Sequence, residues 1–157
     1  MPHALLHPFS PPGKTDFIRI TGGKGAVVWD DAGRRYVDGM ASLWYMNIGH
    51  GREEMAEAIA AQARTLAAYQ TFEPFSNPWA EEAAALIAGL APLGDSRVFF
   101  CNSGSEAVDS AVKISRIAHR QAGHPERTIV VSRERAYHGT NYGGTSLQGI
   151  FWPSRFL

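Results

Sequence analysis

The segment RVFFCNSGSE, residues 97–106, decides the fold, because it changes from a strand pattern to a helix pattern. Its apolar half, 97–101, is typical of a strand buried on both faces. The Asn-Ser-Gly turn breaks that run, and apolar residues then recur at helical spacing until Gly123 and Pro125. A second apolar run, 128–131, follows. Strand, helix and strand in this order predict a βαβ unit, which requires a right-handed crossover and a parallel sheet.

The chain before this unit predicts a β-hairpin and two helices. The expected β elements after a Pro-rich arm are strands at 17–20 and 26–29 with a flexible glycine-rich link at 22–25, a turn at 30–33, and a returning strand at 35–38. Apolar spacing then predicts a helix over 52–68. Asn77 as an N-cap and Pro78 in the first turn predict a second helix, which ends near Leu90.

Composition excludes several classes of protein. Fifteen Lys and Arg balance fifteen Asp and Glu in 157 residues, so no basic excess exists to meet nucleic-acid phosphates. Cys101 is the single cysteine, which excludes an internal disulfide and a multi-cysteine zinc site, and the six scattered histidines predict no metal site. The start has no signal-peptide pattern, and no apolar run is long enough to span a membrane. We therefore expect a soluble, cytoplasmic α/β chain without a nucleic-acid or membrane partner.

The turn at 102–106 has the composition of a phosphate site. Free N–H groups and the macrodipole at a helix N-terminus favour an anion. Gly104 would let the backbone approach it, and the hydroxyls of Ser103 and Ser105 could donate hydrogen bonds. A plain helix cap with Glu106 in the first turn explains the same residues and is the commoner case. The glycine spacing matches neither a P-loop nor a dinucleotide fingerprint.

The loop at 136–140 follows the second predicted strand. Parallel sheets bind ligands beyond the carboxyl ends of their strands, so this loop and the Ser-Gly-Ser turn are expected on the same side. Tyr137 there could stack on a planar heterocycle, or it could pack against the edge of the sheet. A phosphate turn beside a stacking aromatic side chain indicates a phosphorylated aromatic cofactor.

Three separated segments resemble class III pyridoxal-phosphate aminotransferases. They are GMASLWYMNIGHG at 39–51, FFCNSGSEA at 99–107 and YHGT at 137–140, with YGGTS at 142–146 in support. The first resembles the branch that acts on ω-amino acids and amines with pyruvate. The resemblance extends from about Asp30 to Ile150.

That resemblance implies a partial aspartate-aminotransferase-type α/β fold, the pyridoxal-phosphate (PLP) fold type I. Residues 1–46 would form the N-terminal arm and the hairpin of the small domain. Residues 47–157 would form the start of the large parallel-sheet domain, which binds the cofactor. The full-length protein would be a homodimer that moves an amino group from an amine or ω-amino acid to an α-keto acid.

Site residues follow from the same resemblance. Ser103, Gly104 and Ser105 would hold the phosphate of pyridoxal 5′-phosphate. Tyr137 would stack on its pyridine ring, with His138 beside it. Trp44 would line the substrate pocket, although a core aromatic residue near a glycine-rich turn is the alternative for this position.

The catalytic residues of the family have no counterpart in this sequence. Lys14, Lys24 and Lys113 are its three lysines, and none falls in a family motif. The resemblance places the Schiff-base lysine and the aspartate that pairs with the pyridinium nitrogen beyond the end of this chain. The tail at 151–157 also departs from the family, which favours a frameshift or a premature stop, with an ordinary divergent loop as the alternative. We therefore expect the chain alone to be inactive.

Two other functions remain open from the sequence. One is a non-catalytic remnant that binds a partner aminotransferase subunit. The other is a phosphate- or nucleotide-binding module built on the βαβ unit. The pairing of the 137–140 loop with the Ser-Gly-Ser turn weighs against this second function.

Overall fold

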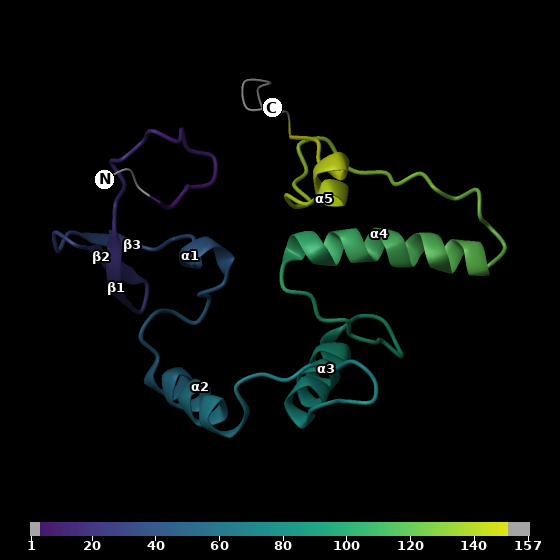
Figure 1. Ribbon diagram of the computed structural model, residues 1–157, viewed down its shortest axis with the longest axis horizontal. Helices are drawn as coiled ribbons and strands as arrows, with labels where there is room; N and C mark the ends of the chain where they lie inside the picture. The colour runs from purple at the N-terminus through teal and green to yellow at the C-terminus, as the bar shows by residue number, and fades with distance from the viewer. Residues whose placement is uncertain (1–3, 151–157) are drawn as a thin grey trace. The chain divides into compact units, whose positions relative to one another are not determined.

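The computed structural model describes residues 4–150 (Figure 1). Its elements in chain order are β1 (Ile20–Lys24), β2 (Val27–Asp30), β3 (Arg35–Val37), α1 (Ala41–Trp44), α2 (Glu53–Leu66), α3 (Pro78–Leu90), α4 (Gly104–Gln121) and α5 (Tyr142–Leu147). The chain divides into two compact units, Met1–Phe75 and Ser76–Leu157. Each unit is described by itself below. The predicted domain boundary at residue 46 stays a prediction.

The first unit contains an antiparallel sheet with the strand order β1-β2-β3. The predicted hairpin of β2 and β3 is confirmed, with Val28 opposite Tyr36. Its turn is closed by Asp30, whose Oδ1 accepts hydrogen bonds from the backbone N–H of Ala32 at 3.0 Å and of Arg34 at 2.9 Å. Turn chemistry that is local in sequence therefore sets the register of this hairpin.

Asp30 is also the most buried side chain of the described residues, at 2% exposed. Its Oδ2 accepts hydrogen bonds from Arg34 Nε and from the Tyr36 hydroxyl, each at 2.8 Å. Burial raises the pKa of this carboxyl, but the hydrogen bonds from Tyr36 and Arg34 outweigh it and hold the pKa at about 2. The carboxylate is thus ionised and fully bonded beneath the turn.

The first strand differs from the prediction. We expected a strand at 17–20 and a flexible link at 22–25, whereas β1 is formed by the glycine-rich segment Ile20–Lys24. The reason is the close packing of rings over the glycines. A side chain at position 22 would lie 2.6 Å from the indole of Trp29, and one at position 23 would lie 2.8 Å from the imidazole of His50. These glycines therefore leave space for the neighbouring rings and do not form the flexible link that the sequence predicted.

The short element α1 is a left-handed turn. The φ angles of Ala41, Ser42, Leu43 and Trp44 are 48°, 55°, 77° and 78°. An L-residue in this region costs roughly 1–2 kcal/mol, because its Cβ approaches a carbonyl oxygen. Four such residues in a row form only where other contacts hold them, and the sequence analysis did not predict this turn.

Helices α2 and α3 confirm their predictions. Glu53 and Glu54 in the first turn of α2 and Arg64 in its last turn match the direction of the helix dipole. At α3, the side-chain oxygen of Asn77 accepts a hydrogen bond from Ala80 N at 2.9 Å, and Pro78 occupies the first turn. Asn77 is therefore the predicted N-cap.

The second unit is organised around α4, the predicted helix after the Ser-Gly-Ser turn. Ser103 is its N-cap, and Gly123 follows its last turn with a φ of 83°. Helix α5 lies against α4, as the yellow and green ribbons of Figure 1 show. We did not predict α5, because two of its six residues are glycines, which are poor helix formers.

The predicted parallel strands are absent. Residues 97–101 and 128–131 are coil in the structure, and the sheet of β1 to β3 is the single sheet within residues 4–150. A strand needs a neighbouring strand to accept and donate its backbone hydrogen bonds, and neither segment has one in this range. Phe99 and Ile129 are accordingly 73% and 89% exposed.

No hydrophobic side chain among the described residues is buried. Local hydrogen bonds and helix caps, rather than an apolar core, therefore define these elements.

Candidate functional site

The N-terminus of α4 presents free hydrogen-bond donors. Ser103 Oγ accepts a hydrogen bond from Glu106 N at 3.1 Å, which is the helix cap expected from the sequence. The N–H groups of Gly104 and Ser105 in the same first turn have no hydrogen-bond partner among residues 4–150. Nothing lies within 4 Å of the position that a Cβ on Gly104 would take. Cap and anion site are therefore compatible, because the cap uses one N–H and leaves two for a ligand.

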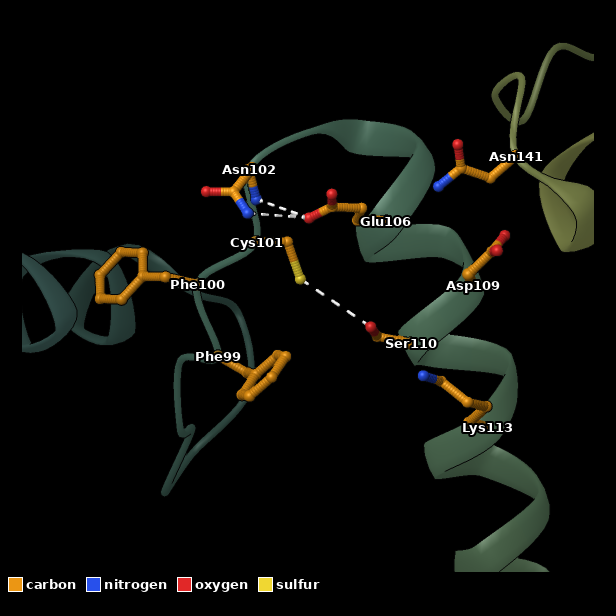
Figure 2. Close-up of a pocket in the computed structure, with 9 residues that line it drawn as sticks. All are labelled: Phe99, Phe100, Cys101, Asn102, Glu106, Asp109, Ser110, Lys113 and Asn141. Carbon is orange, nitrogen blue, oxygen red and sulfur yellow. Dashed lines mark hydrogen bonds between the residues drawn. The ribbon is translucent and has the colours of Figure 1, made fainter. Parts of the chain in front are cut away.

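The carboxylate of Glu106 binds Asn102, the residue before the helix cap. Its Oε2 accepts hydrogen bonds from Asn102 N at 3.0 Å and from Asn102 Nδ2 at 3.2 Å, as the dashed lines of Figure 2 show. A carboxylate beside a phosphate would repel it. The two hydrogen bonds from Asn102 hold the Glu106 carboxylate and partly offset its negative charge.

The structure brings the turn and the 137–140 loop together. Thr140 N donates a hydrogen bond to Ser105 Oγ at 3.0 Å, across 35 positions of sequence. Gly139 is buried with a φ of 115°, and a Cβ on it would lie 2.6 Å from Ser105 Oγ. Glycine is therefore required at position 139 both by its backbone angle and by this close approach. The Ser105 hydroxyl hydrogen stays available to donate to a ligand.

A second contact, which the sequence analysis missed, holds the same two segments together. Asp109 Oδ1 accepts a hydrogen bond from Gly144 N at 2.9 Å. Asp109 lies one helical turn after Ser105, so the two side chains share a face of α4. They bind backbone N–H groups that are also four positions apart, at 140 and 144. The signal in the sequence was the pair of polar residues at i and i+4 in the first turns of this helix.

The remaining predicted residues are placed as follows. Tyr137 is exposed and His138 is half-buried, both in the loop that Gly139 and Thr140 fasten to α4. Trp44 belongs to the first unit, where its side chain is 76% exposed in the left-handed turn. Both interpretations of Trp44, a substrate-pocket residue and a core aromatic residue, stay predictions.

A pocket of about 400 Å³ lies beside the turn, on the face of α4 shown in Figure 2. It is lined by Phe99, Phe100, Cys101, Asn102, Glu106, Asp109, Ser110, Lys113 and Asn141. None of the predicted cofactor residues lines it. Lys113 lies two turns along α4 from Ser105, about 12 Å by the rise of the helix.

Two other kinds of feature are absent from residues 4–150. No three His, Cys, Asp or Glu side chains of these residues gather as metal ligands would. Among the helices of the same range, none has the length and apolarity needed to cross a membrane.

Comparison with known proteins identifies relatives of this chain. Residues 9–150 match the family model of class III aminotransferases. Over 131 residues the chain is 40% identical to the putrescine–pyruvate aminotransferase of Pseudomonas aeruginosa and 40% identical to the β-alanine–pyruvate aminotransferase of the same species. Each alignment covers 83% of this chain and 29% of the relative. The chain thus spans less than a third of the length of these relatives.

Solved structures agree with the sequence comparison. A transaminase from a marine Virgibacillus matches with a TM-score of 0.88 and 39% identity, over 94% of this chain and 34% of that one. An amine transaminase from an uncultivated Pseudomonas species, in its PLP-bound form, matches with a TM-score of 0.87 and 36% identity, over the same shares. The described hairpin and helices therefore have the fold of part of a class III transaminase. The chain belongs to the class III aminotransferase family.

Proposed function

We propose that this chain supplies the phosphate-binding part of a PLP-dependent aminotransferase. The full-length enzyme would move an amino group from an amine or ω-amino acid to an α-keto acid such as pyruvate. The names of the pyruvate-dependent relatives support this substrate class. Ser103, Gly104 and Ser105 would hold the cofactor phosphate, and Tyr137 would stack on its ring.

One observation carries the proposal, namely the hydrogen bond from Thr140 N to Ser105 Oγ. The bond joins the two segments that separately resemble the cofactor motifs of the family. A helix cap alone would not require a loop from 35 positions away to be fastened at its N-terminus. A cofactor that touches the turn with its phosphate and the loop with its ring does require that arrangement.

The described residues fit such a cofactor. The free N–H groups of Gly104 and Ser105 would donate to phosphate oxygens at the positive end of α4. The Ser103 and Ser105 hydroxyl hydrogens would add two further donors. His138 would lie beside the ring that Tyr137 covers, and Trp44 would bound the substrate pocket. Bound PLP would supply an aldehyde carbon that carries the amino group from donor to acceptor and an electron-withdrawing ring that stabilises the negative charge formed on the way.

We further propose that the 157-residue chain does not catalyse this reaction by itself. Lys14 pairs with Asp16 at 3.5 Å, Lys24 lies in β1, and Lys113 is two helical turns from the phosphate turn. None of the three falls in a motif of the family, and the reaction requires a lysine that bonds covalently to the cofactor. In the full-length homodimer, segments 97–101 and 128–131 would be strands of the large parallel sheet, paired with strands that residues 4–150 do not contain.

The proposal is tested with pyridoxamine 5′-phosphate, which has no aldehyde and so cannot label lysines indiscriminately. Equilibrium dialysis of the purified chain should show binding of this compound, competition by inorganic phosphate, and at least about tenfold weaker binding of pyridoxamine, which lacks the charged phosphate. Equal binding of the phosphorylated and unphosphorylated compounds would overturn the assignment of the turn. Tight binding of a nucleotide in its place would favour the phosphate-module alternative.

The absence of catalysis is tested separately. The chain is mixed with PLP and reduced with borohydride, and the labelled lysines are mapped by mass spectrometry. We expect diffuse labelling over Lys14, Lys24 and Lys113 and no transamination of pyruvate. Stoichiometric labelling of one lysine would contradict the proposal, because that residue would then be a functional Schiff-base lysine.

A further inference from the structure

The left-handed turn at 41–44 is held by hydrogen bonds along its own backbone and by one side chain outside it. Trp44 N donates to Met40 O at 2.8 Å, and Met46 N donates to Ala41 O at 2.9 Å. These bonds close the turn but do not select its hand, because a right-handed turn would make bonds of the same kind without the steric conflict. The hand must therefore be imposed by contacts from outside the turn.

Asp38 provides such a contact. Both of its carboxylate oxygens lie within hydrogen-bond reach of Ser42 N, at 3.0 Å and 2.9 Å. His50 Nε2 donates to Asp38 Oδ2 at 2.7 Å. The side chains of His50 and Asp38 are only 18% and 12% exposed. The hydrogen bonds from Ser42 and His50 lower the pKa of Asp38, so the carboxylate stays ionised at neutral pH.

Both residues are themselves fixed to the sheet. Asp38 N donates to Ala26 O at 2.8 Å, directly after β3. His50 and Gly25 exchange two backbone hydrogen bonds of 2.9 Å each. The imidazole of His50 also covers Gly23, where any side chain would overlap it. The backbones of Asp38 and His50 are thus both hydrogen-bonded to the sheet region, and their side chains join the two ends of the loop at 39–49.

We propose that Asp38 and His50 are positioning residues that hold the left-handed turn and thereby fix the direction in which the Trp44 side chain projects. The loop has a 76% exposed Trp44 next to an exposed Tyr45, and Ser42 Oγ donates to the Tyr45 hydroxyl at 3.3 Å. A strained turn with two exposed aromatic side chains is typical of a binding loop that surrounding contacts preorganise. The inference deepens the proposed function and rests on it only for the role of Trp44 beside a substrate.

The test labels the full chain with 5-fluorotryptophan and follows the Trp44 resonance, assigned with the Trp44→Phe variant. Asp38→Ala should shift and broaden that resonance and leave the Trp29 resonance in place. Hydrogen exchange at the Ser42 amide should accelerate at least about tenfold, since its acceptor is removed. His50→Ala should produce a smaller shift in the same direction, and His50→Gln, which retains an N–H donor, should partly reverse it.

Asp31→Ala is the matched control, because Asp31 is a partly exposed carboxylate of the hairpin turn that pairs with Arg19 and does not touch the loop. Protection of the amides paired between Val28 and Tyr36 reports whether the hairpin remains folded. An unchanged Trp44 resonance in Asp38→Ala with that protection retained would overturn the proposal. If the hairpin unfolds in Asp38→Ala, the two His50 variants provide the test. An unchanged Trp44 resonance in both of them would overturn the proposal.

Failure of this inference is distinguishable from failure of the proposed function. The positioning role of the Asp38–His50 pair is tested by the Trp44 resonance and by hydrogen exchange at the Ser42 amide, with no ligand present. The proposed function is tested by binding of pyridoxamine 5′-phosphate to the wild-type chain. A wild-type chain that fails to bind the compound contradicts the function and leaves the Trp44 result standing. A Trp44 resonance that stays unmoved in the Asp38 and His50 variants, together with normal phosphate-dependent binding by the wild type, contradicts only the positioning role of the Asp38–His50 pair.

Discussion

The hairpin of the first unit and the segments flanking α4 have similar strand patterns in sequence, yet only the hairpin forms strands. β2 and β3 pair across a turn of four residues that Asp30 closes. Segments 97–101 and 128–131 are separated by the whole of α4 and would need further strands to pair with. The difference shows that a strand pattern yields a strand only where a hydrogen-bonding neighbour is within reach of the chain.

The largest effect is expected from removing the carboxylate that closes the hairpin. Asp30→Ala leaves two backbone N–H groups, Arg34 and the Tyr36 hydroxyl without their acceptor. Exchange of the Val28 and Tyr36 amides should accelerate roughly 100-fold, because unpaired donors under the turn are costly. If these amides stayed protected, the hydrogen bonds between β2 and β3 would not depend on Asp30. Asp31→Ala, at the next position, is the control.

Acid should weaken the hairpin through the same carboxylate. The folded pKa of Asp30, about 2, lies below its ordinary value of 3.8, so its stabilising contribution is complete above about pH 4 and is lost as the pH falls towards 2. Unfolding of the hairpin should be followed by amide exchange between pH 5 and about 2. The wild type should be more stable than Asp30→Asn at pH 5, and the difference should shrink on acidification. A constant difference would contradict the low pKa.

In the second unit, Gly139→Ala tests the contact between loop and turn. The new Cβ would lie 2.6 Å from Ser105 Oγ at a φ of 115°, so the loop must move away from α4. Binding of pyridoxamine 5′-phosphate should weaken about tenfold, which corresponds to about 1.4 kcal/mol. Gly123→Ala is the matched control, because Gly123 also has a positive φ but nothing lies within 4 Å of its Cβ position. Equal losses in both variants would point to backbone strain alone.

The smallest effect is expected at the cap of α3. Asn77→Ala removes the acceptor of the Ala80 N–H and should destabilise the helix by about 1 kcal/mol. Amide exchange in the first turn of α3 should accelerate roughly fivefold, while exchange in α2 stays unchanged. A change of equal size in α2 would show a global rather than a local loss. Asn77→Ser, which restores a capping oxygen, should recover most of the protection.

Features set by local chemistry could be predicted from the sequence. The hairpin turn with Asp30, the N-cap at Asn77 and the serine cap of α4 each depend on hydrogen bonds within four residues. The sequence left that serine open between Ser103 and Ser105, and the structure has Ser103. The meeting of the Ser-Gly-Ser turn with the 137–140 loop was also anticipated, although from an assumed parallel sheet. In the structure it is the Thr140–Ser105 bond that brings the two segments together.

Features set by distant contacts could not be predicted in this way. The glycine-rich β1 depends on the rings of Trp29 and His50 that cover it. Helix α5 depends on the Asp109 acceptor, 35 positions before Gly144. The left-handed turn depends on Asp38, and Asp38 in turn depends on its hydrogen bond from His50, 12 positions along the chain. In each case the partner is identified only after the chain has folded.

Amide-resolved NMR on the 157-residue chain tests the central claim most directly, which is that the N-terminus of α4 and the 137–140 loop bind one phosphorylated ligand together. Pyridoxamine 5′-phosphate is titrated into the labelled protein. The account predicts saturable shifts at the Gly104, Ser105 and Thr140 amides, with none at the capped Ala80 amide of α3, and much smaller shifts with pyridoxamine. Shifts that spread over both helix N-termini, or that persist without the phosphate, would contradict it.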